Sequence, residues 1–418
     1  MAGADAIAHH AALDARLARA AKPIRLLSLA SWPAREQQAF LAGWARGNPQ
    51  LPQYQYPKLD FADARRELSA IAAAADPTHP LGQYLVESAQ GWVLAAELLE
   101  HLGTPQVTDL SIALFGTPDQ ALPGGATTRE AANHFLRVAD ELDRELVADA
   151  QEVEVSAEAL ALRLQSALDE FFGGRVIAVE LDPDLIAKAA AGASRIRLRA
   201  GAAFSDYDYQ QLLQHEAYVH SLTALNGQRQ PNLPSLALSS PRITATQEGL
   251  AVFAEQITGS IDIERMKRVS LRIEAVAMAL EGADFVQVFR YFLESGQNEV
   301  ESFTAAQRVF RGVPTTGGAA FTKDTVYLRG LIGVHTFFRW ALKQGRLRLC
   351  RRLFAGKMTL ADVQRFEPLF DSGDLLEPTW LPTWVARASG LAGTLAFSLF
   401  ANRIRLEQLG ADGSALDI

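Results

Sequence analysis

The segment HEAYVH, residues 215–220, constrains this chain most, because it sets two histidines and a glutamate on one stretch predicted to be an amphipathic helix. A further glutamate, Glu248, lies in the segment QEGLA near the start of the next predicted helix. The residues His215, His220 and Glu248 are the ligand types of a catalytic zinc site that keeps its fourth position open. The fold must therefore bring the two helices together, and Glu216 is left free to act as general base on a water molecule at the metal.

The spacing of the two histidines predicts a local distortion of their helix. Residues five apart on a regular α-helix point about 140° away from each other around the helix axis. A π-type turn, which is a frequent feature of functional sites, would bring both side chains onto one face. We therefore expect the helix to be widened between His215 and His220.

Capping residues predict where the two helices begin and end. Ser205, followed by an aspartate three residues later, has the spacing of a capped helix start. The pair Asn226-Gly227 is typical of a helix end. Thr244, with a glutamine three residues later, predicts the start of the second helix, and this places Glu248 in its first turn, where the helix dipole favours a carboxylate.

Composition excludes several classes of protein. The chain has 418 residues, of which 49% are hydrophobic and 21% charged, an ordinary globular mixture with room for two domains. The formal net charge of −8 argues against a nucleic-acid partner and gives no general attraction to anionic membranes. The single cysteine, Cys350, excludes an internal disulfide and a cysteine metal cage.

We expect neither a secretory signal nor a membrane-spanning segment in this sequence. The first residues lack the basic start and apolar run of a secretory signal. The longest apolar stretch, 388–401, is too short to span a bilayer and is predicted to be a buried helix. We therefore expect a cytoplasmic protein without a membrane partner, and its oligomeric state stays open.

Hydrophobic periodicity predicts an α+β protein that is mostly helical with a small sheet. The chain divides at Gly173-Gly174 into a mainly helical N-terminal region, 1–172, and a metallopeptidase-like catalytic domain, 173–418. Helices are expected over 36–46, 61–75, 79–103, 127–150 and 156–172 and in most of the chain after 205, and strands over 108–115, 175–181 and 194–200. The alternating segment 194–200 is expected to be a half-buried or edge strand, which could either pair with an extended substrate or be an ordinary strand of the sheet.

Four segments resemble the bacterial flavohemoglobin expression-modulating QEGLA-motif proteins and the related microtubule-associated tyrosine carboxypeptidases of animals. These segments are HEAYVHSLTALNGQRQP (215–231), TATQEGLAVFAE (244–255), RVFRG (308–312) and FTKDTVYLRGL (321–331). The resemblance implies a metallopeptidase with a zincin-like core and the same five-residue histidine spacing. It also implies that zinc is held by His215, His220 and Glu248, with Glu216 as the catalytic base.

Four further residues are candidates for supporting roles. Glu255 lies seven residues after Glu248 on nearly the same helical face, where it could orient a ligating histidine or replace Glu248 as the third ligand. A carboxypeptidase needs a cation for the free carboxylate of its substrate, and Arg311 and Lys323 are the candidates. Tyr327, one helical turn after Lys323, could donate a hydrogen bond to the oxyanion.

These features predict a zinc metallopeptidase that trims the C-terminal ends of peptides or proteins. Two alternatives stay open: a metal-binding regulatory or scaffold protein with a structural zinc ion, and a zinc hydrolase of a non-peptide amide. The sequence leaves undecided which substrate is cut and whether cleavage is at the chain end or internal.

Overall fold

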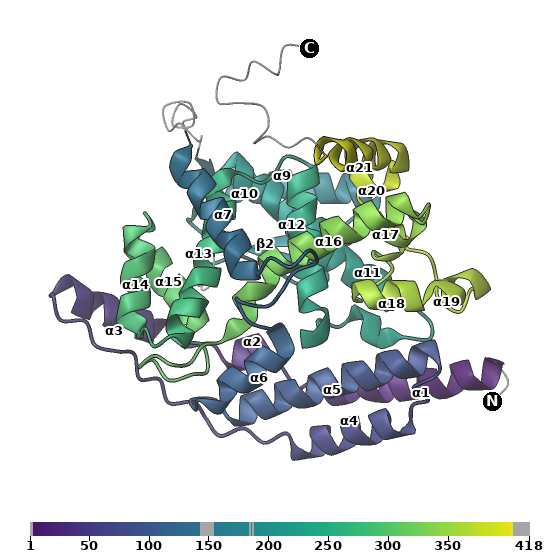
Figure 1. The fold of residues 1–418 in the computed structure, drawn as a ribbon, viewed down its shortest axis with the longest axis horizontal. Coiled ribbons are helices and arrows are strands. Elements are labelled where there is room, and N and C mark those ends of the chain that lie inside the picture. Colours follow the sequence, from purple (N-terminus) through teal and green to yellow (C-terminus); the bar gives the residue numbers. More distant parts are fainter. Residues whose placement is uncertain (1–2, 143–153, 184, 186–187, 404–418) are drawn as a thin grey trace, which may run out of the picture.

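Helices make up most of the structure, a computed structural model that describes residues 3–142, 154–183, 185 and 188–403 (Figure 1). The predicted class, mostly helical with a small sheet, is confirmed. Within the described residues, none of the helices combines the length and the apolar character needed to cross a membrane.

Helices α1, α4 and α5 lie side by side and form a layer along one side of the molecule (Figure 1). Leu17, Leu68 and Leu85, one from each helix, are completely buried in the main core. The helices before Gly173 are α1 (Gly3–Ala21), α2 (Leu26–Leu29), α3 (Ala34–Ala45), α4 (Ala62–Ala74), α5 (Pro80–Glu100), α6 (Gln106–Phe115), α7 (Thr128–Glu141) and α9 (Ala157–Phe172). The helix expected over 127–150 has a capping box at Thr127, and its residues 143–150 lie outside the described part.

The strand expected over 108–115 is wrong, because these residues form helix α6. The buried face of α6 includes two hydroxyl side chains, so polar and apolar residues alternate in the sequence as they would in a strand. The hydroxyl of Thr108 accepts a hydrogen bond from the backbone of Ala320, and that of Ser111 accepts one from the backbone of Thr322. Polar residues are therefore buried with their hydrogen bonds satisfied, and α6 supports the segment that carries Lys323.

The small sheet has the strand order β2-β4-β3. Strand β4 (Arg195–Arg199) is parallel to β2 (Ala178–Asp182) and antiparallel to β3 (Ala189–Ala191). Of the two expectations for the segment 194–200, the ordinary sheet strand is confirmed and the edge strand available to substrate is wrong, because β4 is paired on both sides. A separate two-stranded pair joins β1 (Val155–Ser156) to β5 (Ala203–Phe204).

The helix that carries HEAYVH lies between two hydrophobic cores. It consists of α10 (Asp206–Gln211), the π-helix η1 (Leu212–Ser221) and α11 (Leu222–Gln228). Its side chains Leu213 and Ala217 pack into the smaller core with α9 and β4, whereas Val219 packs into the main core. Contacts on both sides fix the rotation of this helix, and the predicted widening between the two histidines is confirmed.

Two predictions about the ends of these helices need correction, although the capping box at Ser205 is confirmed. Gly227 does not end α11 but lies within it, where a Cβ atom would come 2.3 Å from the carbonyl oxygen of Leu236. Thr244 is not a capping residue, because a 3-10 turn, η3 (Pro241–Ile243), leads directly into α12 (Thr244–Ile257). Glu248 is therefore in the second turn of α12 rather than the first.

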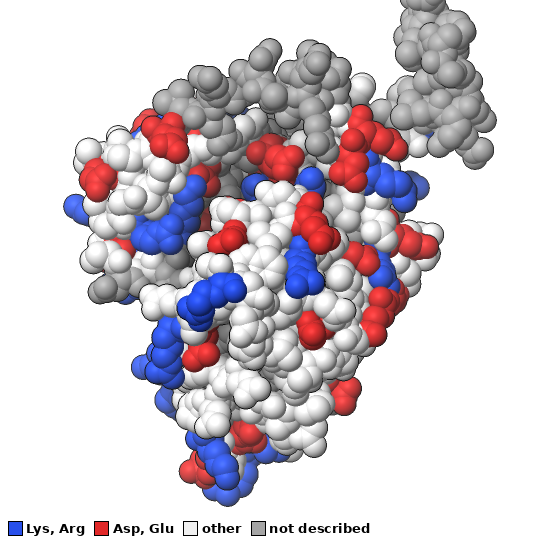
Figure 2. Space-filling view, turned by 90° about the vertical axis from the view of Figure 1, so that its left-hand side faces the viewer, with Lys and Arg blue, Asp and Glu red and all other residues white. Residues whose placement is uncertain are grey.

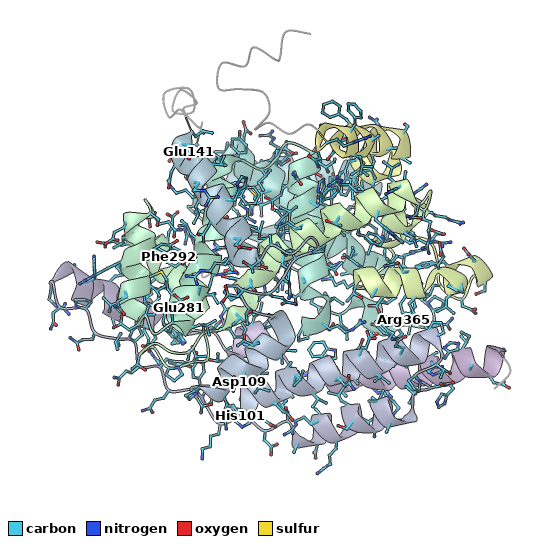
Figure 3. The ribbon with its side chains drawn as sticks, in the orientation of Figure 1. His101, Asp109, Glu141, Glu281, Phe292 and Arg365 are labelled. Atoms are coloured by element: carbon cyan, nitrogen blue, oxygen red, sulfur yellow. The ribbon has the colours of Figure 1, made fainter. Side chains whose placement is uncertain are left out.

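The remaining helices pack beside α12 or lie farther out on either side of it (Figure 1). They are α13 (Ile263–Leu280), α14 (Phe285–Glu294), α15 (Glu299–Val309), α16 (Val326–Lys343), α17 (Arg348–Arg352), α18 (Leu360–Arg365), α19 (Glu367–Ser372), α20 (Thr383–Ala386) and α21 (Ala388–Ala401), with 3-10 segments η2 (Pro234–Ala237) and η4 (Thr322–Thr325). Figure 3 labels Arg365 of α18 beside α5, where its guanidinium pairs with Glu87 at 2.8 Å. The main core includes residues from both sides of residue 172, and the division into two domains there stays a prediction.

Helix α21 corrects the expectation of a buried helix over 388–401. Only Leu391 and Leu395 of this helix are buried, and Phe397 and Phe400 are 74% and 64% exposed.

On the face that Figure 2 displays, acidic and basic side chains both occur, separated by wide areas without charge.

Helices α12 and α16 cross at a pair of glycines, and this contact explains the glycine of QEGLA. A Cβ atom on Gly249 would come 2.1 Å from the backbone carbonyl carbon of Gly330, and one on Gly330 would come 2.1 Å from the carbonyl oxygen of Ala245. Because backbone lies against backbone, no side chain can move aside to make room. The contact sets the distance of Glu248 from the start of α16.

Gly249→Ala is expected to lower the free energy of unfolding by about 1–3 kcal/mol, because the added methyl group must push the two helices apart. The measurement is the midpoint of urea unfolding. Gly393→Ala in α21 is the matched control, since nothing lies within 4 Å of its added Cβ and alanine is the better helix former. A variant as stable as the wild type would show that the crossing is not tight.

Candidate metal centre

His215, His220 and Glu248 converge on one point. Nε2 of His215 lies 3.6 Å from Oε2 of Glu248, and Nε2 of His220 lies 3.7 Å from the same oxygen. The ligand atoms of the three residues all lie within 4.8 Å of one another. Ligand atoms about 2.1 Å from a tetrahedral zinc ion lie roughly 3.4 Å apart, so small movements would let all three bind one ion.

The π-helix is what brings the two histidines together. Their ring centroids are 4.8 Å apart and their planes are inclined by 80°. Because each π-type hydrogen bond spans five residues, His215 and His220 lie one above the other on the same face. Glu248 reaches the two histidines from α12. A hydrogen bond between α11 and α12 holds α12 in position, because the hydroxyl of Thr223 donates to the side-chain oxygen of Gln247 at 3.0 Å.

The other nitrogen of His215 is held by a buried carboxylate. Nδ1 of His215 lies 2.5 Å from Oε1 of Glu255, whose side chain is completely buried. Arg265 of α13 in turn lies 3.3 Å from each oxygen of Glu255. Glu255 therefore faces the side of the ring away from Glu248, an arrangement suited to orienting the imidazole rather than to replacing Glu248 as a ligand.

The electrostatics of this cluster fit a cation. Burial by itself would lower the pKa of His215, but hydrogen bonds to Glu248 and Glu255 outweigh burial and raise it to about 10. The charged imidazole thus balances negative charge that comes from these two residues and from Glu216. A divalent ion would supply positive charge in place of the proton, so the residues present fit a bound metal.

Glu216 stands beside the cluster without being needed to complete it. Its Oε1 lies 4.0 Å from Nε2 of His215, and its side chain is 30% exposed, more than that of any of the three candidate ligands. A carboxylate in this position can reach a water molecule that enters the cleft.

Lys323 and Tyr327 approach Glu248 from the opposite side. Nζ of Lys323 donates to Oε1 of Glu248 at 2.9 Å, which leaves Oε2 of Glu248 to face the histidines. Burial acts to lower the pKa of Lys323, yet the adjacent Glu248 carboxylate raises it overall, so the amine stays charged. The hydroxyl oxygen of Tyr327 accepts hydrogen bonds from Lys323 and from Arg308, both at 3.3 Å, and its own proton remains free to be donated.

These residues line one cleft of about 1130 Å³, a volume that can hold several residues of a peptide. Strand β3 borders it, and Lys357 and Ser239 lie on its wall with a hydrogen bond of 2.7 Å from Nζ to Oγ. Arg311 also lines the cleft, and its role in binding substrate stays a prediction.

Sequence reasoning missed the basic residues that support this cluster. Arg265 and Arg272 lie seven residues apart and so share one face of α13, but exposed arginines have the same spacing on many helices. Arg308 lies in the segment RVFRG beside Arg311, and it makes a two-pronged contact with Asp324 at 2.8 and 2.6 Å. Because the partners are distant in sequence, only the packed structure identifies these pairs.

Comparison with known proteins gives one family. The family model described as microtubule-associated tyrosine carboxypeptidase matches residues 38–403, most of the chain and all of the residues of the candidate metal centre. No curated protein matches the chain. The predicted resemblance to the tyrosine carboxypeptidases is confirmed, and the relation to the QEGLA-motif proteins of bacteria stays a prediction.

Proposed function

This chain belongs to the microtubule-associated tyrosine carboxypeptidase family, and on that premise we propose that it is a zinc-dependent carboxypeptidase with a zincin-like core. Its family is one of carboxypeptidase-like peptidases, so its substrates are peptides or proteins. The observation that carries the proposal is that His215, His220 and Glu248 lie close together in one cleft, with Glu216 beside them and not needed as a ligand. The tyrosine and the microtubules of the family name are properties of relatives and do not identify this chain's substrate.

In the proposed reaction Glu216 is the general base and later the general acid. A zinc ion held by the two histidines and Glu248 would lower the pKa of a water molecule and polarise the scissile carbonyl. Glu216 takes a proton from the attacking water and passes it to the leaving amine. The partial exposure of Glu216 supports this role, since the group must meet both water and substrate.

Tyr327 is the proposed hydrogen-bond donor to the oxyanion. Lys323 and Arg308 both donate a hydrogen bond to the hydroxyl oxygen of Tyr327. Neither cation can accept a hydrogen bond, so the hydroxyl proton can be donated to the oxyanion. Donors that are fixed before the reaction stabilise the developing charge without further reorganisation. Lys323 is committed to Glu248 and Tyr327, so we propose that it orients both residues and that Arg311 is a cation available to substrate.

The alternative of a structural zinc ion receives less support. A structural site is closed by four protein ligands, and the metal-binding group in the described part of the chain has three members. A closed site also has no use for Glu216 at the edge of a cleft.

The backbone of an extended substrate would pair with β3, the outer strand on the cleft side, rather than with β4.

The proposal predicts that removal of the metal abolishes peptide cleavage and that zinc restores it. The test follows release of the last residue from a mixed set of free-acid peptides after dialysis against a chelator and again after one equivalent of zinc. The same peptides with a C-terminal amide are the control and should stay intact, because a carboxypeptidase binds the free carboxylate. Cleavage by metal-free protein would refute zinc dependence, and equal cleavage of the amides would refute exopeptidase action.

A further inference from the structure

One wall of the cleft carries more positive charge than its own carboxylates balance. Three ion pairs can be assigned there: Arg265 with Glu255 at 3.3 Å, Arg308 with Asp324 at 2.6 Å, and Lys323 with Glu248 at 2.9 Å. Two more arginines, Arg272 on α13 and Arg311 just beyond α15, line the same cleft.

Neither Arg272 nor Arg311 has a carboxylate partner among the residues that the structure describes. The Nε atom of each is buried and makes no hydrogen bond there. Burial lowers the pKa of each guanidinium to about 10, and both remain charged near neutral pH. Both side chains are partly buried, and the nearby Asp324 is already paired with Arg308, so the two arginines form a preformed site for negative charge that arrives with a ligand.

The two guanidinium groups lie in the same part of the cleft. Both interact electrostatically with the Arg308–Asp324 pair and with Tyr327, the proposed oxyanion donor. They therefore line the part of the cleft that contains Tyr327. A divalent ion bound to the histidines would add to the positive charge and would not offset it.

We propose that the C-terminal residue removed by this protein is dicarboxylic, glutamate or aspartate, with one of the two arginines binding its main-chain carboxylate and the other its side-chain carboxylate. The inference rests on the proposed function and names the substrate class. A single carboxylate satisfies one guanidinium, and a neutral last residue, such as the tyrosine of the family name, leaves the second charge buried and unpaired. Arginine suits this task because its planar group binds carboxylates through two hydrogen bonds.

The test compares peptides that differ only in the last residue. The zinc-loaded protein is given free-acid peptides ending in Glu, Gln or Tyr, and kcat/KM is measured from the residue released. Glu and Gln have nearly the same shape, so their ratio isolates the side-chain charge. The Glu peptide is expected to exceed the Gln peptide by about 10²-fold, the usual consequence of leaving one member of a buried charge pair unpaired.

Two variants assign the arginines. One of Arg272→Gln and Arg311→Gln should bring the Glu-to-Gln ratio close to one, and the other should lower kcat/KM for both peptides alike. Arg268→Gln, at an exposed position of α13, is the matched control and should change neither value. Loss of an unpaired buried charge should leave the unfolding temperature of the two variants unchanged or raised, so a failure to fold would contradict the proposed role.

Binding of the released residue gives a readout apart from turnover. Free glutamate should raise the unfolding temperature of the zinc-loaded protein more than free glutamine at the same concentration. Gln or Tyr peptides cleaved as fast as the Glu peptide would overturn this inference and leave the carboxypeptidase proposal standing. No cleavage of any free-acid peptide would reject the carboxypeptidase proposal, and this inference with it.

Discussion

Glu216→Gln is expected to keep its zinc and to lower kcat by about 10²–10⁴-fold, the contribution usual for a positioned general base. Glutamine has nearly the same shape as glutamate but cannot accept a proton from water at neutral pH. The three candidate ligands are untouched by the change, because Glu216 lies at the edge of their cluster, 4.0 Å from the nearest ligand nitrogen. Metal content and turnover should therefore separate in this variant.

The measurement combines elemental analysis with steady-state kinetics on the peptides that the wild-type protein cleaves. Glu264→Gln, an exposed position on α13, controls for the loss of one carboxylate from the protein as a whole. Undiminished turnover would show that Glu216 is not the base. Loss of zinc in the same variant would instead identify Glu216 as a ligand.

The sequence predicted the centre of this site better than its surroundings, for a physical reason. The five-residue separation puts His215 and His220 on one face only if the helix is widened, so the hypothesis that both bind one metal predicted the π-turn. The residues of QEGLA carry information of the same local kind. Gln247 ties α12 to α11, Glu248 faces the histidines, and Gly249 allows the contact with α16.

Errors arose where one residue type serves two structural purposes. Glycine ends helices and also permits close packing, and Gly227 does the second where sequence reasoning expected the first. Thr108 and Ser111 are polar but buried, because they accept hydrogen bonds from distant backbone groups, so a helix looked like an alternating strand. These roles depend on partners far along the chain, which local patterns do not contain.

The order of strands was equally hidden from the sequence. Residues Ala189–Ala191 form the outer strand β3 although three alanines show no alternation, and they cover the edge of β4 that the sequence suggested was free. The absence of an ion pair for Arg272 and Arg311 in the described residues is also a tertiary property, because the carboxylate near them, Asp324, is paired with Arg308. Sequence patterns report which groups are present and seldom report which partners are missing.

His215→Ala is expected to reduce bound zinc from about one ion per chain to almost none and to abolish turnover. His215 is the most buried of the three candidate ligands, and it is the one whose second nitrogen is anchored, through Glu255, to Arg265. Its loss removes a ligand and leaves the carboxylates of Glu248 and Glu255 without the imidazole between them. A two-ligand remnant cannot form the three-ligand site that catalytic zinc requires.

Elemental analysis of the purified variant beside the wild type is the measurement, with circular dichroism to verify that the variant is folded. His335→Ala, a half-buried histidine of α16 that packs near Phe253, is the matched control and should retain its zinc. Full zinc content in His215→Ala would mean that the metal binds elsewhere. Absence of zinc from the wild type even after it is supplied would favour a binding or regulatory role, because the catalytic proposal needs a bound zinc ion.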